Sequence, residues 1–340
     1  MNKTGVVCAG NWIIDQVKFV DSWPKKGELT NIVSESYGAG GSPFNILIDL
    51  AHINVSFPTF GVGCIGNDTL GKTVIEMCEK EGLSSGHLTV LPNASTSYTD
   101  VMMVQKTGER TFFHQRGANA NFAPKHIPLE LLDPEKIEIF HLGYLLLLDE
   151  FDEFNSNGET KAAEFLKECQ KKGVKTSIDI VSEASERAVN IVTPSLPYVN
   201  YLIINEVEAG NIVSKQLRHN DESVDIDAVK EAARKLKELG VNDVVLIHFP
   251  EGAVWYDKDD NLVYRESLSL PENFIVGSVG AGDAFCAGAL VGIKEKMSPV
   301  EVITFASGMA AACLSASNTT DGIKSREYVN ELISKFSKKC

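Results

Sequence analysis

The segment Val279-Gly280-Ala281-Gly282-Asp283 combines residue types that suit the transfer of a phosphoryl group. Gly280 and Gly282 flank Ala281 where a loop enters a helix of small residues, so backbone N–H groups should converge at a helix N-terminus and form an anion hole. A carboxylate beside that hole would repel phosphate unless it acts on the group that attacks the phosphate. Asp283 therefore fits a general base for a hydroxyl nucleophile. The alternative is an Asp that caps a helix after a glycine turn.

A second glycine-rich segment, Gly38-Ala39-Gly40-Gly41-Ser42-Pro43-Phe44-Asn45, suits the binding of a polyol. Gly40 and Gly41 have no Cβ and let the backbone approach a ligand, and Asn45 places an amide one turn into the next helix. Upstream, Asp15 lies just past the first strand, where its carboxylate would hold two vicinal hydroxyls. Each residue also has a structural interpretation: Asn45 as a satisfied buried amide, Asp15 as a solvated strand end.

The elements that must position these residues begin with a strand-rich part of about 120 residues. Period-2 patterns and turn residues predict strands over 12–19, 29–37, 98–105 and 110–115, the last two joined by a hairpin loop with Gly108 at positive φ. Helices are predicted over 44–53, with Ser42 as N-cap and Pro43 at N1, and around 70–78, ending at Gly82. The two strand pairs predict a small, discontinuous β-sheet lid from about 12–37 and 96–117.

From about residue 137 the pattern alternates between strand and helix. Strands are predicted over 137–142, 174–180, 201–204 and 244–248, and helices over 161–172 and 228–239. Such alternation implies right-handed crossovers and a parallel sheet covered by helices on both faces. We expect one α/β domain over residues 1–340: a three-layer α/β/α sandwich with a mainly parallel central sheet and the β lid. Ligands in such sheets bind at the carboxyl ends of the strands.

Composition excludes several classes of function. The 340 residues are 44% hydrophobic and 23% charged, which is ordinary for a folded protein. A formal net charge of −14 argues against nucleic acid as a partner, and no apolar run is long enough to span a bilayer. The seven cysteines are scattered without Cys-x-x-Cys spacing, which favours reduced thiols and a cytoplasmic location. The seven histidines likewise lack the spacing of a metal site.

Over about residues 5–335 the sequence resembles the ribokinase-like sugar kinases, the PfkB carbohydrate kinase family. The resemblance is carried by the two glycine segments above and by three further motifs, which are Gly61–Gly71, Arg116-Gly117-Ala118-Asn119 and Asn205-Glu206-Val207-Glu208. It implies a ribokinase-like fold and the ATP-dependent phosphorylation of a hydroxymethyl group on a small sugar or sugar-like alcohol.

The resemblance also implies roles for single residues. Asp283 would be the base, and the amides of Gly280, Ala281 and Gly282 would hold the developing charge of the γ-phosphoryl group. Asn205 and Glu208 would organise Mg²⁺ and its waters, and Asp179, at the end of a central strand, would face the phosphates. The substrate hydroxyls would be bound by Asp15, Gly40, Gly41 and Asn45, with Asn11 and Arg116 as further candidates. Without the resemblance, Asn205 and Glu208 read equally well as a helix-start cap.

Three segments depart from the family pattern. Gly277-Ser278 stands where members often have Asp-Thr, which argues against a monovalent-cation loop. His248–Gly252 replaces a glycine-containing loop on the nucleotide side, and Ser307 stands near where an Asn often touches the nucleotide. Gly252 and Ser307 are thus the candidates for the nucleotide side. These departures leave a second interpretation open, a non-catalytic sensor that binds a sugar or a nucleotide; the presence of Asp283 argues against it.

A different ATP motif also occurs. Gly66–Thr73 matches the P-loop pattern Gly-x₄-Gly-Lys-Ser/Thr. Asp68, however, would project a carboxylate from the phosphate site and reads better as a helix N-cap, which puts Gly71 and Lys72 inside the helix. We therefore predict that Lys72 is a surface lysine and that the P-loop interpretation is wrong.

The residues do not decide among ribose, fructose, a keto-deoxy sugar acid and a nucleoside as substrate, so a nucleoside kinase of the same family is an alternative. Selectivity should reside in lid side chains such as Phe112, His114 and Arg116. Because an uncovered β edge is a liability, the lid is also expected to pair with that of a second copy in a homodimer.

Overall fold

The alternating strands and helices build a nine-stranded sheet in the computed structural model, which describes residues 4–182 and 187–337. Its order is β13-β12-β11-β10-β9-β8-β1-β4-β5. The bounds are β1 Gly5–Gly10, β4 Thr59–Gly66, β5 Leu88–Leu91, β8 Ile137–Leu145, β9 Lys175–Ile180, β10 Tyr201–Asn205, β11 Val244–Phe249, β12 Gly252–Asp257 and β13 Leu262–Glu266. All pairs are parallel except β11–β12 and β12–β13, so the predicted mainly parallel sheet is confirmed.

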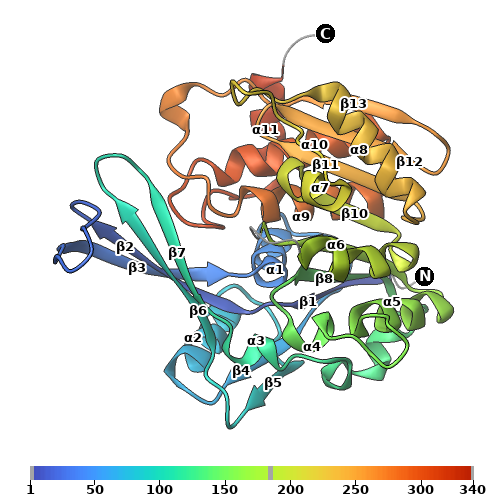
Figure 1. The fold of residues 1–340 in the computed structure, drawn as a ribbon, viewed down its shortest axis with the longest axis horizontal. Coiled ribbons are helices and arrows are strands. Elements are labelled where there is room, and N and C mark those ends of the chain that lie inside the picture. The colour runs from blue at the N-terminus through green and yellow to red at the C-terminus, as the bar shows by residue number, and fades with distance from the viewer. Residues whose placement is uncertain (1–3, 183–186, 338–340) are drawn as a thin grey trace.

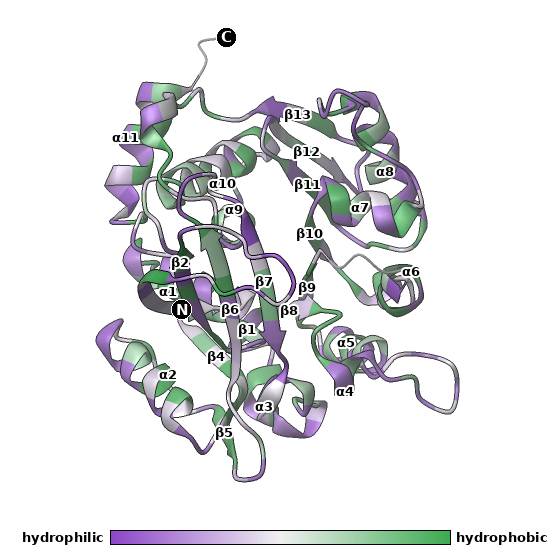
Figure 2. Ribbon diagram, turned by 60° about the vertical axis from the view of Figure 1, so that its left-hand side comes forward, coloured by the Kyte–Doolittle hydropathy of each residue, from purple (hydrophilic) through white to green (hydrophobic). Residues whose placement is uncertain are grey.

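Helices cover both faces of this sheet (Figure 1). Side chains alternate along β1: Val6 and Cys8 pack on one side, Val7 and Ala9 on the other. The first side carries α1 Ser42–His52, α2 Thr69–Lys80, α9 Ala281–Lys294, α10 Pro299–Cys313 and α11 Arg326–Phe336. The second carries α3 Gly117–Ala120, α4 Asp149–Asp152, α5 Lys161–Lys171, α6 Arg187–Val192, α7 Glu206–Val213 and α8 Ile226–Glu238. In Figure 2 the outer helices α2, α8 and α11 show both hydrophilic and hydrophobic turns, as amphipathic helices should.

The two early strand pairs form a separate four-stranded sheet of order β3-β2-β6-β7, which projects at the left of Figure 1. Its strands are β2 Ile13–Val20, β3 Ile32–Gly40, β6 Ser97–Val104 and β7 Arg110–Gln115. The pairs β2–β3 and β6–β7 are antiparallel, whereas β2 and β6 are parallel, which joins the two predicted hairpins into one sheet. Gly108 has φ of 71°, as the hairpin loop required.

The order of the large sheet reverses between β1 and β8. From β1 the chain proceeds to β4 on one side, and from β8 it proceeds through β9 and β10 on the other. In open parallel sheets such a reversal leaves a crevice at the carboxyl ends of the two strands, where ligands bind. Here the side chain of Asn11, which follows β1, donates hydrogen bonds to the carbonyls of Gly143 (3.4 Å) and Tyr144 (3.1 Å) near the end of β8.

Helix α1 begins one residue earlier than predicted, and the prediction of Ser42 as its N-cap is wrong. Gly41 is the N-cap, with φ of 88°, and a Cβ there would lie 2.1 Å from the backbone oxygen of Asn11, so only glycine fits. The hydroxyl of Ser42, the first helical residue, is instead donated to the carboxylate of Asp179. Pro43 is therefore the second helical residue, one position later than the predicted N1.

The start of α2 shows whether the segment Gly66–Thr73 has the shape of a P-loop. Asp68 is the N-cap and accepts a hydrogen bond of 2.8 Å from the backbone N–H of Gly71. Gly71 and Lys72 therefore lie within the helix, and the side chain of Lys72 is exposed. A phosphate cradle needs free amides in this loop, so the structure agrees with a surface lysine and not with a P-loop.

Two further expectations concern the whole chain. Within the described ranges, no helix is both long and apolar enough to cross a membrane. Six cysteines (8, 64, 78, 169, 286 and 313) are free and buried, while Cys340 lies outside the described residues.

Helix α1 carries an unusual buried acid. Asp49 is fully buried, and neither of its carboxyl oxygens has a hydrogen-bond partner among the residues that the structure describes. Burial, reinforced by the charge of Asp283, raises the pKa of Asp49 well above its ordinary value. The carboxyl is then neutral in the folded protein but ionised in the unfolded chain, which destabilises the fold increasingly as pH rises above about 4.

We predict that Asp49→Asn raises the free energy of unfolding by about 1 kcal/mol or more at pH 7.5, because the amide needs no protonation on folding. The difference should vanish near pH 3, where the unfolded chain also holds the proton. Urea titrations of both proteins at the two pH values measure it. A variant less stable than the wild type at pH 7.5 would contradict the prediction.

Candidate active site

A buried carboxylate lies at the start of α9. Asp283, in the first turn of this helix, is only 5% exposed. Its Oδ2 accepts a hydrogen bond of 2.7 Å from the side-chain amide of Asn45 on α1. The hydroxyl of Tyr144, near the end of β8, donates to both oxygens, at 2.9 Å to Oδ1 and 3.2 Å to Oδ2. Three elements distant in sequence therefore fix the orientation of one carboxyl group.

The surroundings make this carboxylate more basic than usual. Burial, reinforced by the charge of Asp179, raises the pKa of Asp283 to about 7, while the hydrogen bonds from Asn45 and Tyr144 act in the opposite direction. A carboxyl group with this pKa accepts a proton more readily near neutral pH than an exposed Asp does.

The two glycines before Asp283 differ in how much space surrounds them. Gly280, the N-cap of α9, has φ of 83°, and a Cβ there would lie 2.7 Å from the backbone oxygen of Thr319. At Gly282 the nearest atom to an added Cβ would be His248 Cε1, at an ordinary 3.5 Å. The first amides of α9 have no acceptor within the helix, so this N-terminus has the properties of an anion site.

Asp283 lines a cavity of about 390 Å³ with two further buried acids, Asp179 at the end of β9 and Glu208 on α7. We call it the acidic cavity. No lysine or arginine occurs among the described residues that line it. Three carboxyl groups without a neighbouring cation favour the binding of a positive ion.

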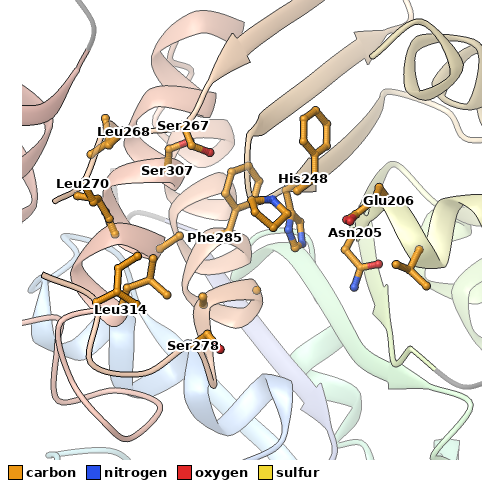
Figure 3. A pocket seen from close by; sticks show the side chains of 18 residues that line it. Asn205, Glu206, His248, Ser267, Leu268, Leu270, Ser278, Phe285, Ser307 and Leu314 are labelled. Carbon is orange, nitrogen blue, oxygen red and sulfur yellow. The ribbon is translucent and has the colours of Figure 1, made fainter. Parts of the chain in front are cut away.

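A second cavity of about 630 Å³ adjoins the first, and Asn205, His248, Ser278 and Gly282 line both. Its far part is mostly apolar, with Leu268, Leu270 and Leu314 beside the hydroxyls of Ser267 and Ser307 (Figure 3). We call it the apolar cavity. A flat, mostly apolar group could occupy this cavity while an anionic group reached the N-terminus of α9.

His248 stands where the two cavities meet. Its ring packs against Phe285 with centroids 4.7 Å apart. Burial lowers the pKa of His248 to about 4, so the imidazole is neutral near pH 7. It acts as a wall of the site and not as a source of positive charge.

Asn205 and Glu208 form the predicted helix cap and also face a cavity. They form a capping box at the start of α7: the Glu208 N–H donates to Asn205 Oδ1, and the Asn205 N–H donates to Glu208 Oε2, each at 2.9 Å. Ser182 donates a third hydrogen bond to Glu208, at 2.8 Å. Both residues also line the acidic cavity. Burial raises the pKa of Glu208 to about 8, so a cation nearby would favour its ionised form.

The other predicted substrate residues meet at the inner face of the four-stranded sheet. Asp15 lies within β2 beside Thr99 of β6, and a Cβ on Gly40 would lie 2.5 Å from Asp15 Oδ1. Burial and the charge of Asp283 raise the pKa of Asp15 to about 7. Thr99 in turn contacts His114 Nδ1 at 3.0 Å, and His114 Nε2 is buried without a partner among the described residues. This row offers both donors and acceptors to hydroxyl groups.

Three predicted residues are occupied elsewhere. The amide of Asn11 is bound to backbone carbonyls, as described above. Arg116 donates to Asp149 Oδ1 at 2.5 Å and to the carbonyl of Leu146 at 2.9 Å. Gly252 begins β12, does not line either cavity, and is glycine because a Cβ would lie 2.4 Å from the backbone oxygen of Arg265. Ser307, in contrast, lines the apolar cavity.

Sequence reasoning missed Tyr144 and Arg110. Tyr144 follows a glycine in an apolar strand and has no motif around it. Arg110, at the start of β7, donates to Ser278 Oγ at 3.1 Å and so connects the four-stranded sheet to the loop before α9. Its position after Gly108-Glu109 in the hairpin was visible, but only the fold brings it to that loop.

One cluster of potential metal ligands adjoins the acidic cavity. His141, Asp179 and Cys286 have ligand atoms within 4.8 Å of one another. The His141 ring already contacts Ser177 at 3.0 Å and Ser42 at 3.4 Å, and Asp179 accepts the Tyr144 N–H at 2.6 Å. These contacts describe a buried hydrogen-bonded cluster that holds Asp179 in place.

Comparisons with known proteins relate this chain to one family and one fold. A family model described as pfkB family carbohydrate kinase matches residues 3–326. A ribokinase of Arabidopsis thaliana is 23% identical over 334 residues, covering 98% of this chain and 81% of the relative. An adenosine kinase of Schizosaccharomyces pombe is 23% identical over 298 residues, covering 86% and 84%. The solved structure of Arabidopsis thaliana ribokinase complexed with ribose and ATP superposes with a TM-score of 0.77 at 22% identity, covering 99% of this chain and all of that one.

The two glycines of the anion site predict a contrast between matched variants. Gly280→Ala should lose about 1–3 kcal/mol of folding stability, because its backbone is left-handed. Gly282→Ala should keep or gain up to about 1 kcal/mol, because alanine favours the helix, yet its methyl group would project toward His248 where the cavities meet. The kcat/KM of Gly282→Ala should fall roughly 10²-fold, since the methyl group would displace a phosphate bound at the N-terminus of α9. Urea titration and steady-state assays test both; an active Gly282→Ala enzyme would contradict the assignment.

Proposed function

Because this chain belongs to the pfkB family of carbohydrate kinases, we propose that it transfers the γ-phosphoryl group of ATP to a hydroxymethyl group of a small sugar or sugar-like alcohol. The observation that carries the proposal is the buried Asp283 carboxylate, held by Asn45 and Tyr144 beside the N-terminus of α9. A protein that only bound a sugar or nucleotide would have no use for a basic carboxylate beside a phosphate site.

In the proposed mechanism Asp283 is the general base. The attacking hydroxyl donates a hydrogen bond to this carboxylate, its oxygen attacks the γ-phosphorus, and its proton passes to Asp283 as ADP leaves. The amides of Gly280, Ala281 and Gly282 and the dipole of α9 stabilise the charge on the transferred group. Because the transition state is loose, the proton leaves late, and a carboxyl with a pKa near 7 suffices.

The apolar cavity is the proposed nucleotide site. The adenine would lie among Leu268, Leu270 and Leu314, with Ser307 as a polar contact, and the phosphates would extend past His248 toward Gly280 and Gly282. The neutral ring of His248 does not add a charge there. Gly252 is not part of the proposed nucleotide site, because it does not line the apolar cavity.

The residues of the acidic cavity fit Mg²⁺. Asn205, Glu208 and Asp179 offer oxygen atoms, which this ion prefers, and burial followed by the charges of Asp179 and Asp283 raises the pKa of Glu208, so a nearby cation would favour its ionised form. We propose that Asn205 and Glu208 hold the ion through water molecules and that Asp179 faces it. When bound, Mg²⁺ would offset the negative charge of the phosphates.

The acceptor is proposed to bind between Asp15 and Asp283, under the four-stranded sheet acting as a lid. Gly40 and Gly41 bring the backbone close, and His114 and Phe112 line the same face. The contact of Arg110 with Ser278 supports closure of the lid over the phosphate site. Closure excludes water, which would otherwise take the place of the acceptor. Arg116 is proposed to hold the base of the lid through Asp149 and to reach the substrate only if that ion pair opens.

The outer face of the lid supports the proposal of a homodimer. Phe113 of β7 is 52% exposed and stacks on Trp23 with centroids 6.4 Å apart, and Leu29, which lies with Trp23 in the loop between β2 and β3, is 86% exposed. A second copy of the lid would cover these side chains. Sedimentation at micromolar concentration should give twice the mass of one chain.

We also propose that the protein is cytoplasmic, because the six described cysteines are free.

A coupled assay of ADP release tests the proposal. With ATP and Mg²⁺, a panel of sugars, sugar acids and nucleosides should contain one good acceptor. Asp283→Asn should lose roughly 10²–10⁴-fold in kcat, because the amide cannot accept the proton. Lys72→Ala, which changes an exposed lysine, serves as the control and should retain activity. Turnover on a nucleoside would favour the nucleoside kinase alternative, and tight sugar binding without turnover would favour the sensor.

The pH profile should reflect the buried carboxyl groups. Asp283 must be ionised to act, and its pKa is raised to about 7, so kcat/KM for the acceptor should fall as pH drops below 7. The pKa of Asp15 is also raised to about 7, so the fall of kcat/KM with pH should be steeper than the titration of a single group would give. Asn45→Ala removes a donor that stabilises the carboxylate and should move the decline to higher pH. A midpoint near pH 4 in the wild type would contradict this account.

A further inference from the structure

Tyr144 has an unusual backbone near the carboxyl end of β8. Its φ is 56°, Leu146 nearby has φ of 82°, and the pairing of β8 with β9 shifts between Leu142 and Leu145. Non-glycine residues adopt this conformation only where the surroundings impose it, at a cost of about 1–3 kcal/mol. An irregular strand redirects a side chain that a regular strand would point elsewhere. The irregularity lies at the reversal of strand order, where ligands bind.

The contacts of Tyr144 show what the irregularity achieves. The backbone N–H donates to Asp179 Oδ1 at 2.6 Å, and the carbonyl accepts from the Asn11 side chain at 3.1 Å. With its backbone fixed on both sides, the side chain reaches Asp283 and lines the acidic cavity. Its hydroxyl lies 2.9 Å and 3.2 Å from the two carboxyl oxygens.

These contacts leave little of Asp283 free. The phenol bridges both oxygens, and the Asn45 amide takes a further position on Oδ2. A hydroxyl that is to lose its proton to Asp283 must donate a hydrogen bond to one of the same two oxygens. The phenol has the same chemistry as that hydroxyl, an O–H donor on a carbon skeleton, and it is already in place.

We propose that the Tyr144 hydroxyl occupies the position of the attacking hydroxyl on Asp283 in the free enzyme, and that the acceptor displaces it on binding. The proposal rests on the assignment of Asp283 as the base that receives the acceptor's proton. Displacement exchanges one O–H···O hydrogen bond for another, and no covalent bond changes. Burial and the charges of Asp283 and Asp179 raise the pKa of the phenol, so it remains a donor and does not compete for the proton.

The exchange has a consequence for specificity. In the wild type, the attacking hydroxyl of the acceptor gains little net from Asp283, because its hydrogen bond replaces the one that Tyr144 donates in the free enzyme. Without the phenol oxygen, no side chain among the described residues would donate an O–H to Asp283, and the hydrogen bond from the acceptor hydroxyl to this charged group would count in full. Tyr144 thus reduces binding through the reacting hydroxyl and leaves selection to the other hydroxyl contacts.

A two-by-two comparison of affinities tests this. Calorimetry at pH 8 without nucleotide measures two ligands: the acceptor identified by the ADP-release assay, and its analogue lacking the phosphorylated hydroxyl. For the wild type we expect the two dissociation constants to agree within about threefold. For Tyr144→Phe the complete acceptor should bind about tenfold more tightly than its analogue. Equal ratios in the two proteins would overturn the proposal.

Tyr201→Phe, a half-buried tyrosine on β10, is the matched control and should show the wild-type ratio. If Tyr144→Phe does not fold, a crystal structure of the wild type with the acceptor tests the displacement of Tyr144 instead. Displacement puts the Tyr144 hydroxyl beyond hydrogen-bond distance of Asp283, whereas a retained bond overturns the proposal. An enzyme without any acceptor would refute the proposed function itself, and an acceptor with equal ratios would refute only the role of Tyr144.

Discussion

Burial of the Asp283 carboxylate at the N-terminus of α9 is the constraint around which the other elements are arranged. A buried carboxyl group is costly unless hydrogen bonds satisfy it, and here the donors come from Asn45 on α1 and Tyr144 on β8. To bring these donors together, α1 must begin at the left-handed Gly41, β8 must end irregularly, and α9 must begin at the left-handed Gly280. The same burial makes the group a base suited to neutral pH.

The charge of the acidic cavity favours the binding of a cation. Asp179, Glu208 and Asp283 face one cavity, and no lysine or arginine lines it among the described residues. Burial, reinforced by the charges of the neighbouring acids, raises the pKa values of Glu208 and Asp283. A divalent cation with a nucleotide would bring positive charge to Glu208 and Asp179 and phosphate to the amides of α9, so each ligand favours the binding of the other.

Much of this arrangement could be predicted from the sequence, because its signals are local. The glycine pairs, Asp283 after its glycines, and the alternation of strand and helix each depend on a few neighbouring residues. The capping pattern of Asn205 and Glu208 was equally visible, but local pattern alone could not tell a cap from a ligand site; the structure shows the cap and places both side chains in the lining of the acidic cavity. Arg116 pairs with Asp149, which follows from how α3 and α4 pack and not from either motif. The role of Tyr144 could not be predicted from the sequence, since its orientation depends on the irregular end of a strand and on contacts with Asn11 and Asp179.

The central claim is that Asp283 receives the proton of the attacking hydroxyl. A crystal structure of the wild type with its acceptor, Mg²⁺ and a non-hydrolysable ATP analogue tests it most directly. The account predicts the hydroxymethyl oxygen within about 3 Å of a carboxyl oxygen of Asp283 and in line with the γ-phosphorus, whose oxygens face the amides of Gly280 to Gly282. An acceptor hydroxyl that approaches the γ-phosphorus from elsewhere, with Asp283 still bound only to Asn45 and Tyr144, would contradict it.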